Sequence, residues 1–130
     1  MLKIIIASGP VIVENNKVLL NKHGDDTFWK FCGGRVEEDE VNLKNSARRE
    51  VKEEMGIEIE ILDDIPYFFY TEKEISGNQV SVVLAHFLAK RVGQVVPGED
   101  IREWSWIDIN DLDKEKLAPN IKPVLKHFGF

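Results

Sequence analysis

Residues 43–57 read LKNSARREVKEEMGI, and the apolar positions of this stretch form one face against which the surrounding chain can pack. An apolar residue recurs at every fourth position, which is the spacing of one face of an α-helix, through Leu43, Ala47, Val51 and Met55. Gly56 follows directly, and glycine most readily adopts the left-handed conformation that ends a helix. The pattern therefore predicts a helix from about Asn42 to Met55.

Acidic residues interrupt this apolar face. With Ala47 at zero on a helical wheel, Glu54 falls at about −20°, inside the face, and Glu50 at about −60°, on its edge. Glu50 also has Glu53 and Glu54 as neighbours at three and four residues, where like charges repel. A buried carboxylate is costly unless a proton, a base or a metal neutralises it. Mg²⁺ or Mn²⁺ would remove both penalties, since these ions prefer oxygen ligands. The alternative is a solvated acidic helix on which Glu54 reaches the surface.

Strands surround the predicted helix on both sides. Before it we expect a hairpin with arms at 11–13 and 18–20, and then a loop from Asn21 to Phe31. After it, alternation predicts strands at 57–61, 67–70, 80–88 and 104–107. A last helix is expected from Pro119, with Ile121, Leu125 and Phe128 facing the core. A mixed sheet with helices packed against it is the economical arrangement.

The negative charge of the chain is local. The 130 residues carry 17 Lys and Arg against 23 Asp and Glu, for a net charge of −6. Residues 33–64 hold eleven of the acids and five of the bases, which accounts for the whole excess. An acidic chain lacks the basic face that unspecific duplex binding requires, so we expect no stable nucleic-acid binding.

Length and cysteine content suggest an ordinary globular protein. The length fits one domain, expected to span residues 1–130. The single cysteine, Cys32, excludes an internal disulfide and suits a reducing compartment. The apolar run at residues 3–7 is broken by Ser8-Gly9-Pro10, too early for a membrane span. We therefore expect a cytoplasmic protein without a membrane segment.

Two stretches of the chain carry a family pattern. Gly34 to Glu40, followed by Arg49 to Ile57, resembles the Nudix box of the Nudix hydrolases, G-x5-E-x7-R-E-U-x-E-E-x-G-U, where U is a bulky aliphatic residue. The second half matches at every specified position. Eight residues, instead of seven, separate Glu40 from Arg49, and we place the extra one near Val41-Asn42, because loops absorb insertions. The resemblance extends over nearly the whole chain, through the hairpin, Trp29-Lys30-Phe31 and Trp104 to Ile107.

The resemblance implies a fold, an activity and a set of site residues. The fold would be the Nudix α/β/α sandwich, of mixed α/β (α+β) class, with a central mixed β-sheet. The activity would be metal-dependent hydrolysis of a diphosphate bond in a nucleoside diphosphate derivative. The resemblance assigns Mg²⁺ (or Mn²⁺) to four groups: Glu50, Glu53, Glu54 and the Gly34 carbonyl.

The same resemblance gives roles to residues around these ligands. Arg49 would orient Glu53, and Arg35 would contact the substrate. Glu53 is one candidate for the general base. A second group of candidates precedes Trp106, namely Glu99, Asp100 and Glu103, of which Glu103 is preferred; the alternative for all three is a solvated acidic turn.

The tail of the chain bears on the substrate. Residues 117–123 look similar to the end of MutT-like nucleoside triphosphate pyrophosphohydrolases, where an asparagine reads the purine, so Asn120 could pair with a base. It could equally cap the last helix. Several aromatics could stack a base, although core packing is more common for such residues: Trp29, Tyr67, Phe68, Phe69 and Trp104. The histidines, His23, His86 and His127, are interpreted as ordinary surface or core residues.

A small-molecule nucleotide is therefore the expected partner, and a (d)NTP of the MutT type is the first choice. The alternatives are an ADP-ribose or nucleotide-sugar hydrolase, a dinucleoside polyphosphate hydrolase, and a non-catalytic Nudix nucleotide-binding module. The sequence is compatible with a monomer or a homodimer.

Overall fold

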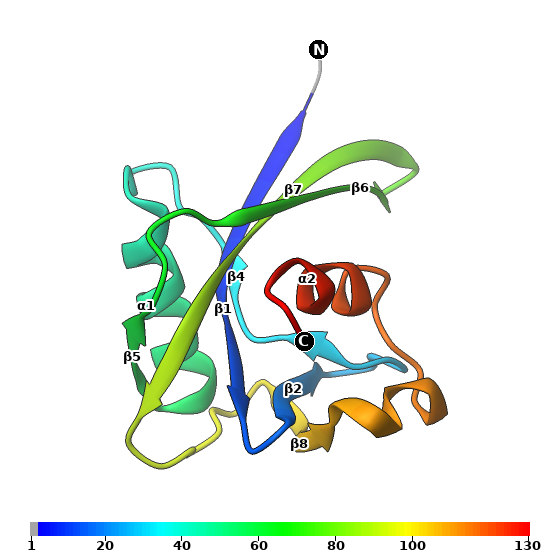
Figure 1. Cartoon of the computed structure of the whole chain (residues 1–130). Coiled ribbons are helices and arrows are strands. Elements are labelled where there is room, and N and C mark those ends of the chain that lie inside the picture. Colours follow the sequence, from blue (N-terminus) through cyan, green and yellow to red (C-terminus); the bar gives the residue numbers. More distant parts are fainter. Residues whose placement is uncertain (1–2) are drawn as a thin grey trace.

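A computed structural model describes residues 3–130 (Figure 1). Along the chain, the elements are β1 (Ile4–Glu14), β2 (Lys17–His23), β3 (Lys30–Phe31), β4 (Gly34–Arg35), α1 (Leu43–Met55), β5 (Glu58–Ile61), β6 (Tyr67–Ile75), β7 (Asn78–Val92), β8 (Ile101–Asp108), the 3₁₀ helix η1 (Ile109–Lys114) and α2 (Ile121–His127). No helix among residues 3–130 is long and apolar enough to cross a bilayer.

The sheet is mixed and is built around two long strands. β1 and β7 pair in parallel from Ile4 opposite Ser81 to Ile12 opposite Ala89. All other strand pairs are antiparallel, with β2 beside β1, β3 and β8 beside β2, and both β5 and β6 beside β7. Because β1 and β7 are parallel neighbours, the intervening chain must cross over a face of the sheet, and α1 lies in that crossover.

Two hairpin turns use residues that tolerate a positive φ. Asn15 and Asn16, at φ 50° and 62°, connect β1 to β2. Ser76 and Gly77, at φ 53° and 79°, connect β6 to β7. Positive φ at both central residues matches the twist of two-residue hairpins. The predicted hairpin between residues 11–13 and 18–20 is therefore confirmed.

Helices cover the two faces of the sheet, as Figure 1 shows for α1 and α2. Alternate residues of β1 point to opposite faces, so Ile12 packs with Val51 and Met55 of α1. Its neighbour Val11 packs with Val124 and Leu125 of α2 on the other face. The predicted α/β/α sandwich with a central mixed sheet is confirmed.

The strands are longer than the sequence pattern predicts. β1 begins at Ile4 and continues through Ser8-Gly9-Pro10, because β7 pairs with it along this segment. The expected loop from Asn21 to Phe31 is shorter than predicted: β2 continues to His23 and β3 covers Lys30–Phe31, which leaves residues 24–29 between the strands. Pairing with β8 holds Asn21 to His23 in the sheet, and this long-range partner leaves no local signal.

Candidate active site

The helix α1 carries most of the candidate site, and local interactions fix both of its ends. The Asn42 side chain caps the first turn by accepting hydrogen bonds from the backbone N–H groups of Lys44 (2.9 Å) and Asn45 (3.3 Å). Gly56 ends the helix in the left-handed conformation at φ 67°. The predicted helix is confirmed, and its register sets the directions of all its carboxylates.

Arg49 connects three carboxylates of the site through one guanidinium group. Its Nε and Nη2 donate to the two carboxylate oxygens of Glu40, both at 2.8 Å. Its Nη1 donates to Glu50 at 3.0 Å and to Glu53 at 3.2 Å. The paired hydrogen bonds from Arg49 are the main cause that lowers the pKa of Glu40 to about 2. The geometry agrees with the expectation that Arg49 orients Glu53.

The extra residue before α1 does not disturb this network. Val41 is 98% exposed, and Asn42 lies outside the helix as its N-cap. Glu40 still reaches Arg49, and it also accepts a hydrogen bond from the Glu37 N–H at 2.8 Å. Val41 and Asn42, where we place the extra residue, thus lie in the turn before the helix.

Glu54 is buried, as its position on the helical wheel predicts. The residue is 7% exposed, so the alternative of a solvated Glu54 is wrong. Its Oε1 accepts from the backbone N–H of Gly33 at 2.8 Å, and its Oε2 lies 2.8 Å from Nε2 of His23. These two contacts compensate for much of the cost of burying a carboxylate.

His23 is a site residue that the sequence interpretation missed. It ends β2 on the face that packs against α1, which it shares with Leu19 and Asn21. The alternation that could have revealed this is hidden, because residues 18 to 21 are all buried and β2 shows no polar face there. A pattern of alternate exposed residues would have been needed to extend the strand to His23.

Gly34 and Glu50 lie in direct contact. A Cβ on Gly34 would stand 2.3 Å from Oε2 of Glu50, so a larger residue at this position would displace the carboxylate from its place beside the backbone. Burial raises the pKa of Glu50, and the neighbouring Glu54 and Glu53 charges add to the rise, while Arg49 opposes it. A cation placed here would favour the charged form of Glu50.

The donor groups fit a hard divalent cation. Carboxylates on successive turns of one helix, next to a backbone carbonyl, are the oxygen ligands that Mg²⁺ and Mn²⁺ prefer. Among residues 3–130, no three His, Cys, Asp or Glu side chains are already gathered for a metal. Arg49 and His23 instead hold these carboxylates, so a metal would compete with both for their oxygens.

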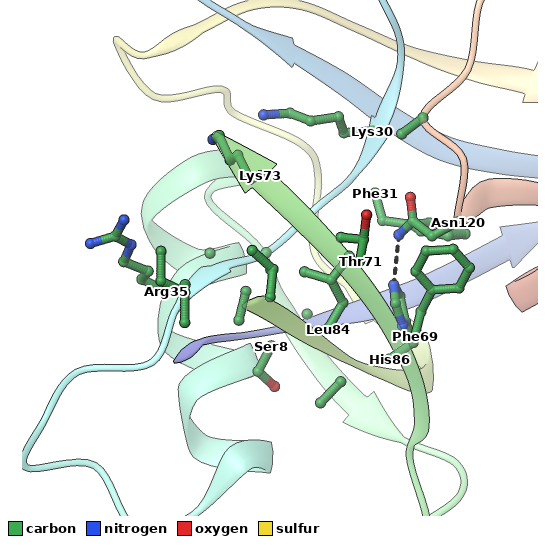
Figure 2. Close-up of a pocket in the computed structure, with 18 of the residues that line it drawn as sticks. Ser8, Lys30, Phe31, Arg35, Phe69, Thr71, Lys73, Leu84, His86 and Asn120 are labelled. Atoms are coloured by element: carbon green, nitrogen blue, oxygen red, sulfur yellow. Dashed lines mark hydrogen bonds between the residues drawn. The ribbon is translucent and has the colours of Figure 1, made fainter. Parts of the chain in front are cut away.

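A cavity of about 520 Å³ starts beside these groups. Its lining includes Gly33, Gly34 and Arg35 at one part and Asn120 at another. Figure 2 shows Phe69 and Thr71 of β6 and Leu84 of β7 between them. The volume is within the usual range for a small-molecule site.

Asn120 does not cap α2. Its side chain makes no capping hydrogen bond, so that alternative is wrong. The residue is 7% exposed, lines the cavity and places its Nδ2 at 2.9 Å from Nε2 of His86 (Figure 2). His86 is therefore a second histidine at the site for which the sequence interpretation predicted no role.

Of the five aromatic residues considered for stacking, Phe69 alone lines this cavity. Trp29 belongs to the core, Tyr67 stacks on His127, and Phe68 and Trp104 are exposed. Phe28 and Phe31 line the cavity instead. No sequence pattern singles them out, because Phe28 lies in the turn that precedes β3 and Phe31 lies on the two-residue strand β3 itself.

Basic side chains also line the cavity. Figure 2 shows Arg35 and Lys73 on the side away from Asn120, with the Lys30 amine directed toward them. Lys30 pairs with Asp26 at 2.9 Å. Within residues 3–130, neither Arg35 nor Lys73 forms an ion pair. This part of the cavity can therefore attract an anion.

A helix rich in carboxylates next to a cavity lined with cations suits a metal-assisted reaction on phosphates. The NUDIX domain family matches residues 5–128 of the chain. The chain belongs to the Nudix family. Residues 34–57 are thus its Nudix box, and the protein is a Nudix hydrolase.

Three relatives show the range of this Nudix similarity. An ADP-ribose pyrophosphatase from Methanocaldococcus jannaschii is 28% identical, over 95% of this chain and 72% of that protein. A nucleoside triphosphatase, NudI, from Escherichia coli is 25% identical, over 92% of this chain and 93% of that protein. The crystal structure of a MutT NUDIX hydrolase from Burkholderia pseudomallei shares the fold with a TM-score of 0.76 at 22% identity, over 95% of this chain and 97% of that one.

Three acids outside the Nudix box lie in two places. Glu99 and Asp100 line a second cavity, of about 420 Å³, together with His23. Glu103 lies on β8 opposite Lys22 and pairs with it at 3.7 Å. Glu103 also contacts Arg102 at 3.4 Å. Its ion pairs within residues 3–130 do not include a box residue.

Proposed function

We propose that this Nudix hydrolase is metal-dependent and cleaves a diphosphate linkage of nucleoside triphosphates. The observation that carries the proposal is the single cavity that joins the box residues Gly34 and Arg35 to Asn120. A nucleotide placed in it would have its phosphates beside Glu50 and Glu54 and its base beside Asn120. Residues 1–130 would then act as one Nudix domain.

The charge of the cavity favours a polyphosphate tail over a second sugar. Its lining holds three basic side chains and two acidic ones, Asp26 and Glu72, and Lys30 is paired with Asp26. The remaining excess of positive charge, with Arg35 and Lys73 at its centre, suits a triphosphate better than the neutral terminal ribose of ADP-ribose. Because the relatives include an ADP-ribose pyrophosphatase and a nucleoside triphosphatase, both substrate classes belong in the assay. ADP-ribose is accordingly the second candidate.

The proposed mechanism assigns a task to each box residue. Glu50, Glu53, Glu54 and the Gly34 carbonyl would hold Mg²⁺ or Mn²⁺, which supplies charge neutralisation and polarises a phosphoryl oxygen. Arg49 keeps Glu50 and Glu53 in place through its hydrogen bonds. Arg35 contacts the phosphates. His23 and the Gly33 N–H hold the two carboxylate oxygens of Glu54 in place.

Glu53 is our first choice for the residue that accepts the proton of the attacking water. Its side chain is 60% exposed, so a water molecule can reach it, while Arg49 limits its orientation. Glu103 remains the alternative predicted from the sequence. Glu103→Gln distinguishes them: it should lower kcat by about 100-fold or more if Glu103 is the base and stay near wild type if Glu53 is the base. Glu53→Gln lowers kcat in either case, because it also changes a proposed metal ligand.

A substrate panel tests the proposal. Nucleoside triphosphates, ADP-ribose, a nucleotide sugar and a dinucleoside polyphosphate would be incubated with Mg²⁺ and with Mn²⁺, and the products identified by ³¹P NMR. We expect a nucleoside monophosphate and pyrophosphate, or a diphosphate and phosphate, from triphosphates, and no turnover with EDTA. Preference for ADP-ribose would overturn the substrate assignment, and binding without turnover would indicate a non-catalytic module.

Glu54→Gln is the decisive variant of the box. It removes one negative charge with little change in volume, and we expect kcat to fall by about 100-fold or more. Glu58→Gln is the matched control, because Glu58 is exposed and, within residues 3–130, forms an ion pair with Lys52 alone. Full turnover by Glu54→Gln would contradict the mechanism.

A further inference from the structure

Two buried polar side chains meet at the end of the cavity that lies away from Arg35. Asn120 precedes α2 and His86 lies on β7, and Figure 2 shows the hydrogen bond that joins Asn120 Nδ2 to His86 Nε2, at 2.9 Å. His86 is 4% exposed. The inference drawn from this pair rests on the proposed function, because it assumes that a nucleotide occupies the cavity.

The surroundings of His86 determine which of its nitrogens carries the proton. Its Nδ1 lies 3.2 Å from the backbone carbonyl oxygen of Tyr67, which can only accept a hydrogen bond. Nδ1 must therefore be the N–H donor. Burial lowers the pKa of the ring to about 4, so the ring is neutral near pH 7 and Nε2 is a bare acceptor.

This tautomer leaves one orientation for the Asn120 amide. A bare Nε2 can only accept, so the group that faces it must be the Nδ2 donor and not the carbonyl oxygen. A rotated amide would place two acceptors against each other. Oδ1 consequently points away from His86, as Figure 2 shows, and Asn120 makes no other side-chain hydrogen bond within residues 3–130.

We propose that His86 is a positioning residue that locks the Asn120 amide, so that Asn120 Oδ1 accepts a hydrogen bond from an N–H group of the substrate's nucleobase. Phe31 contacts the His86 ring edge to face at a centroid distance of 5.3 Å and, with Phe69, provides the apolar walls beside the amide. An unlocked asparagine can rotate and read either a donor or an acceptor. The locked Asn120 amide presents Oδ1, an acceptor, at a fixed position and therefore selects for a donor there.

A set of variants tests the lock through KM. His86→Phe keeps an aromatic ring and removes the acceptor, so KM for the preferred nucleotide should rise by about tenfold, with kcat within about twofold. His86→Gln restores an acceptor and should recover most of the affinity. In Asn120→Ala the lock has nothing to position, so adding His86→Phe to it should cause no further loss.

His127→Phe is the matched control, because His127 stacks on Tyr67 and is absent from the cavity lining. It should leave KM unchanged. If His86→Phe behaves like this control, or if its effect adds fully to that of Asn120→Ala, the lock is overturned.

A measurement independent of turnover separates this inference from the proposed activity. Long-range ¹H–¹⁵N NMR of the wild-type histidine rings should show His86 protonated on Nδ1, and a non-hydrolysable nucleoside triphosphate should shift the Asn120 side-chain amide signal. Protonation on Nε2, or no shift on binding, overturns the lock. Binding with the expected shifts but without hydrolysis would overturn only the proposed activity and support the lock.

Discussion

Arg49 determines the arrangement of the carboxylates in the Nudix box. Its planar guanidinium bonds to both oxygens of Glu40 while its remaining nitrogen reaches Glu50 and Glu53. These contacts raise the pKa of Arg49 further above its ordinary value, chiefly through Glu40, so the group stays charged. A lysine offers one point charge and cannot form this fork.

Arg49→Lys should therefore reduce activity without unfolding the protein. We expect kcat to fall by about 10- to 100-fold, because Glu53 loses its orientation. The pKa of Glu40, about 2 in the wild type, should rise toward its ordinary value, which ¹³C NMR of the carboxyl groups can follow. Arg48→Lys is the control, since the Arg48 guanidinium, within the described residues 3–130, hydrogen-bonds to the Asn45 side chain alone. Unchanged kcat in Arg49→Lys would show that Glu53 needs no such support.

The helix α1 joins local stability to the site. Its capping asparagine, its apolar face and its terminal glycine place Glu50 and Glu54 on the side toward Gly33-Gly34. Shifting the helix by one residue would move each carboxylate by about 100° around its axis. The cap at Asn42 therefore supports the geometry of the site as well as the helix.

Asn42→Ala tests the cap. Loss of its hydrogen bonds to Lys44 and Asn45 should lower the free energy of unfolding by about 1 kcal/mol, measured by urea denaturation followed by circular dichroism. Asn42→Asp should keep most of the stability. Asn45→Ala is the control: Asn45 lies one turn further along the helix, and its side chain caps no backbone N–H. This change should alter stability by less than about 0.5 kcal/mol. A cap variant as stable as this control would contradict the assignment.

At the scale of the whole molecule, the sheet brings distant segments to one cavity. β6, β7 and β1 present one face to it, and the segment before α2 closes its end with Asn120. This closure buries His86 between sheet and helix, and the buried ring has a pKa of about 4, compared with an ordinary value of 6.5. The tertiary structure thus adds a pH dependence to stability.

Stability should fall as the pH falls from about 6.5 to about 4. In this window the unfolded chain binds a proton at His86 that the folded protein does not, so acid favours unfolding. The shift corresponds to about 3 kcal/mol. Urea denaturation of wild type and His86→Phe would be measured at pH 7, 6, 5 and 4.5. The wild type should lose most of this free energy of unfolding by pH 4.5, whereas the variant should lack this loss. Parallel pH profiles would refute the contribution of His86.

The helix, its terminal glycine, the first hairpin and the Nudix box were predictable from the sequence, because these features depend on residues near one another in the chain. The burial of Glu54 was likewise predictable, since one helical turn shows it inside the apolar face. The partners of Glu54 and Asn120 were not. His23 and His86 reach them from strands that are 31 and 34 residues away along the chain. The pairing of β2 with β8, and of β7 with both β1 and β6, holds the two histidines there. A local pattern shows that a carboxylate or an amide needs a partner, but the tertiary structure selects that partner, because contacts between distant strands leave no periodic signal in either segment.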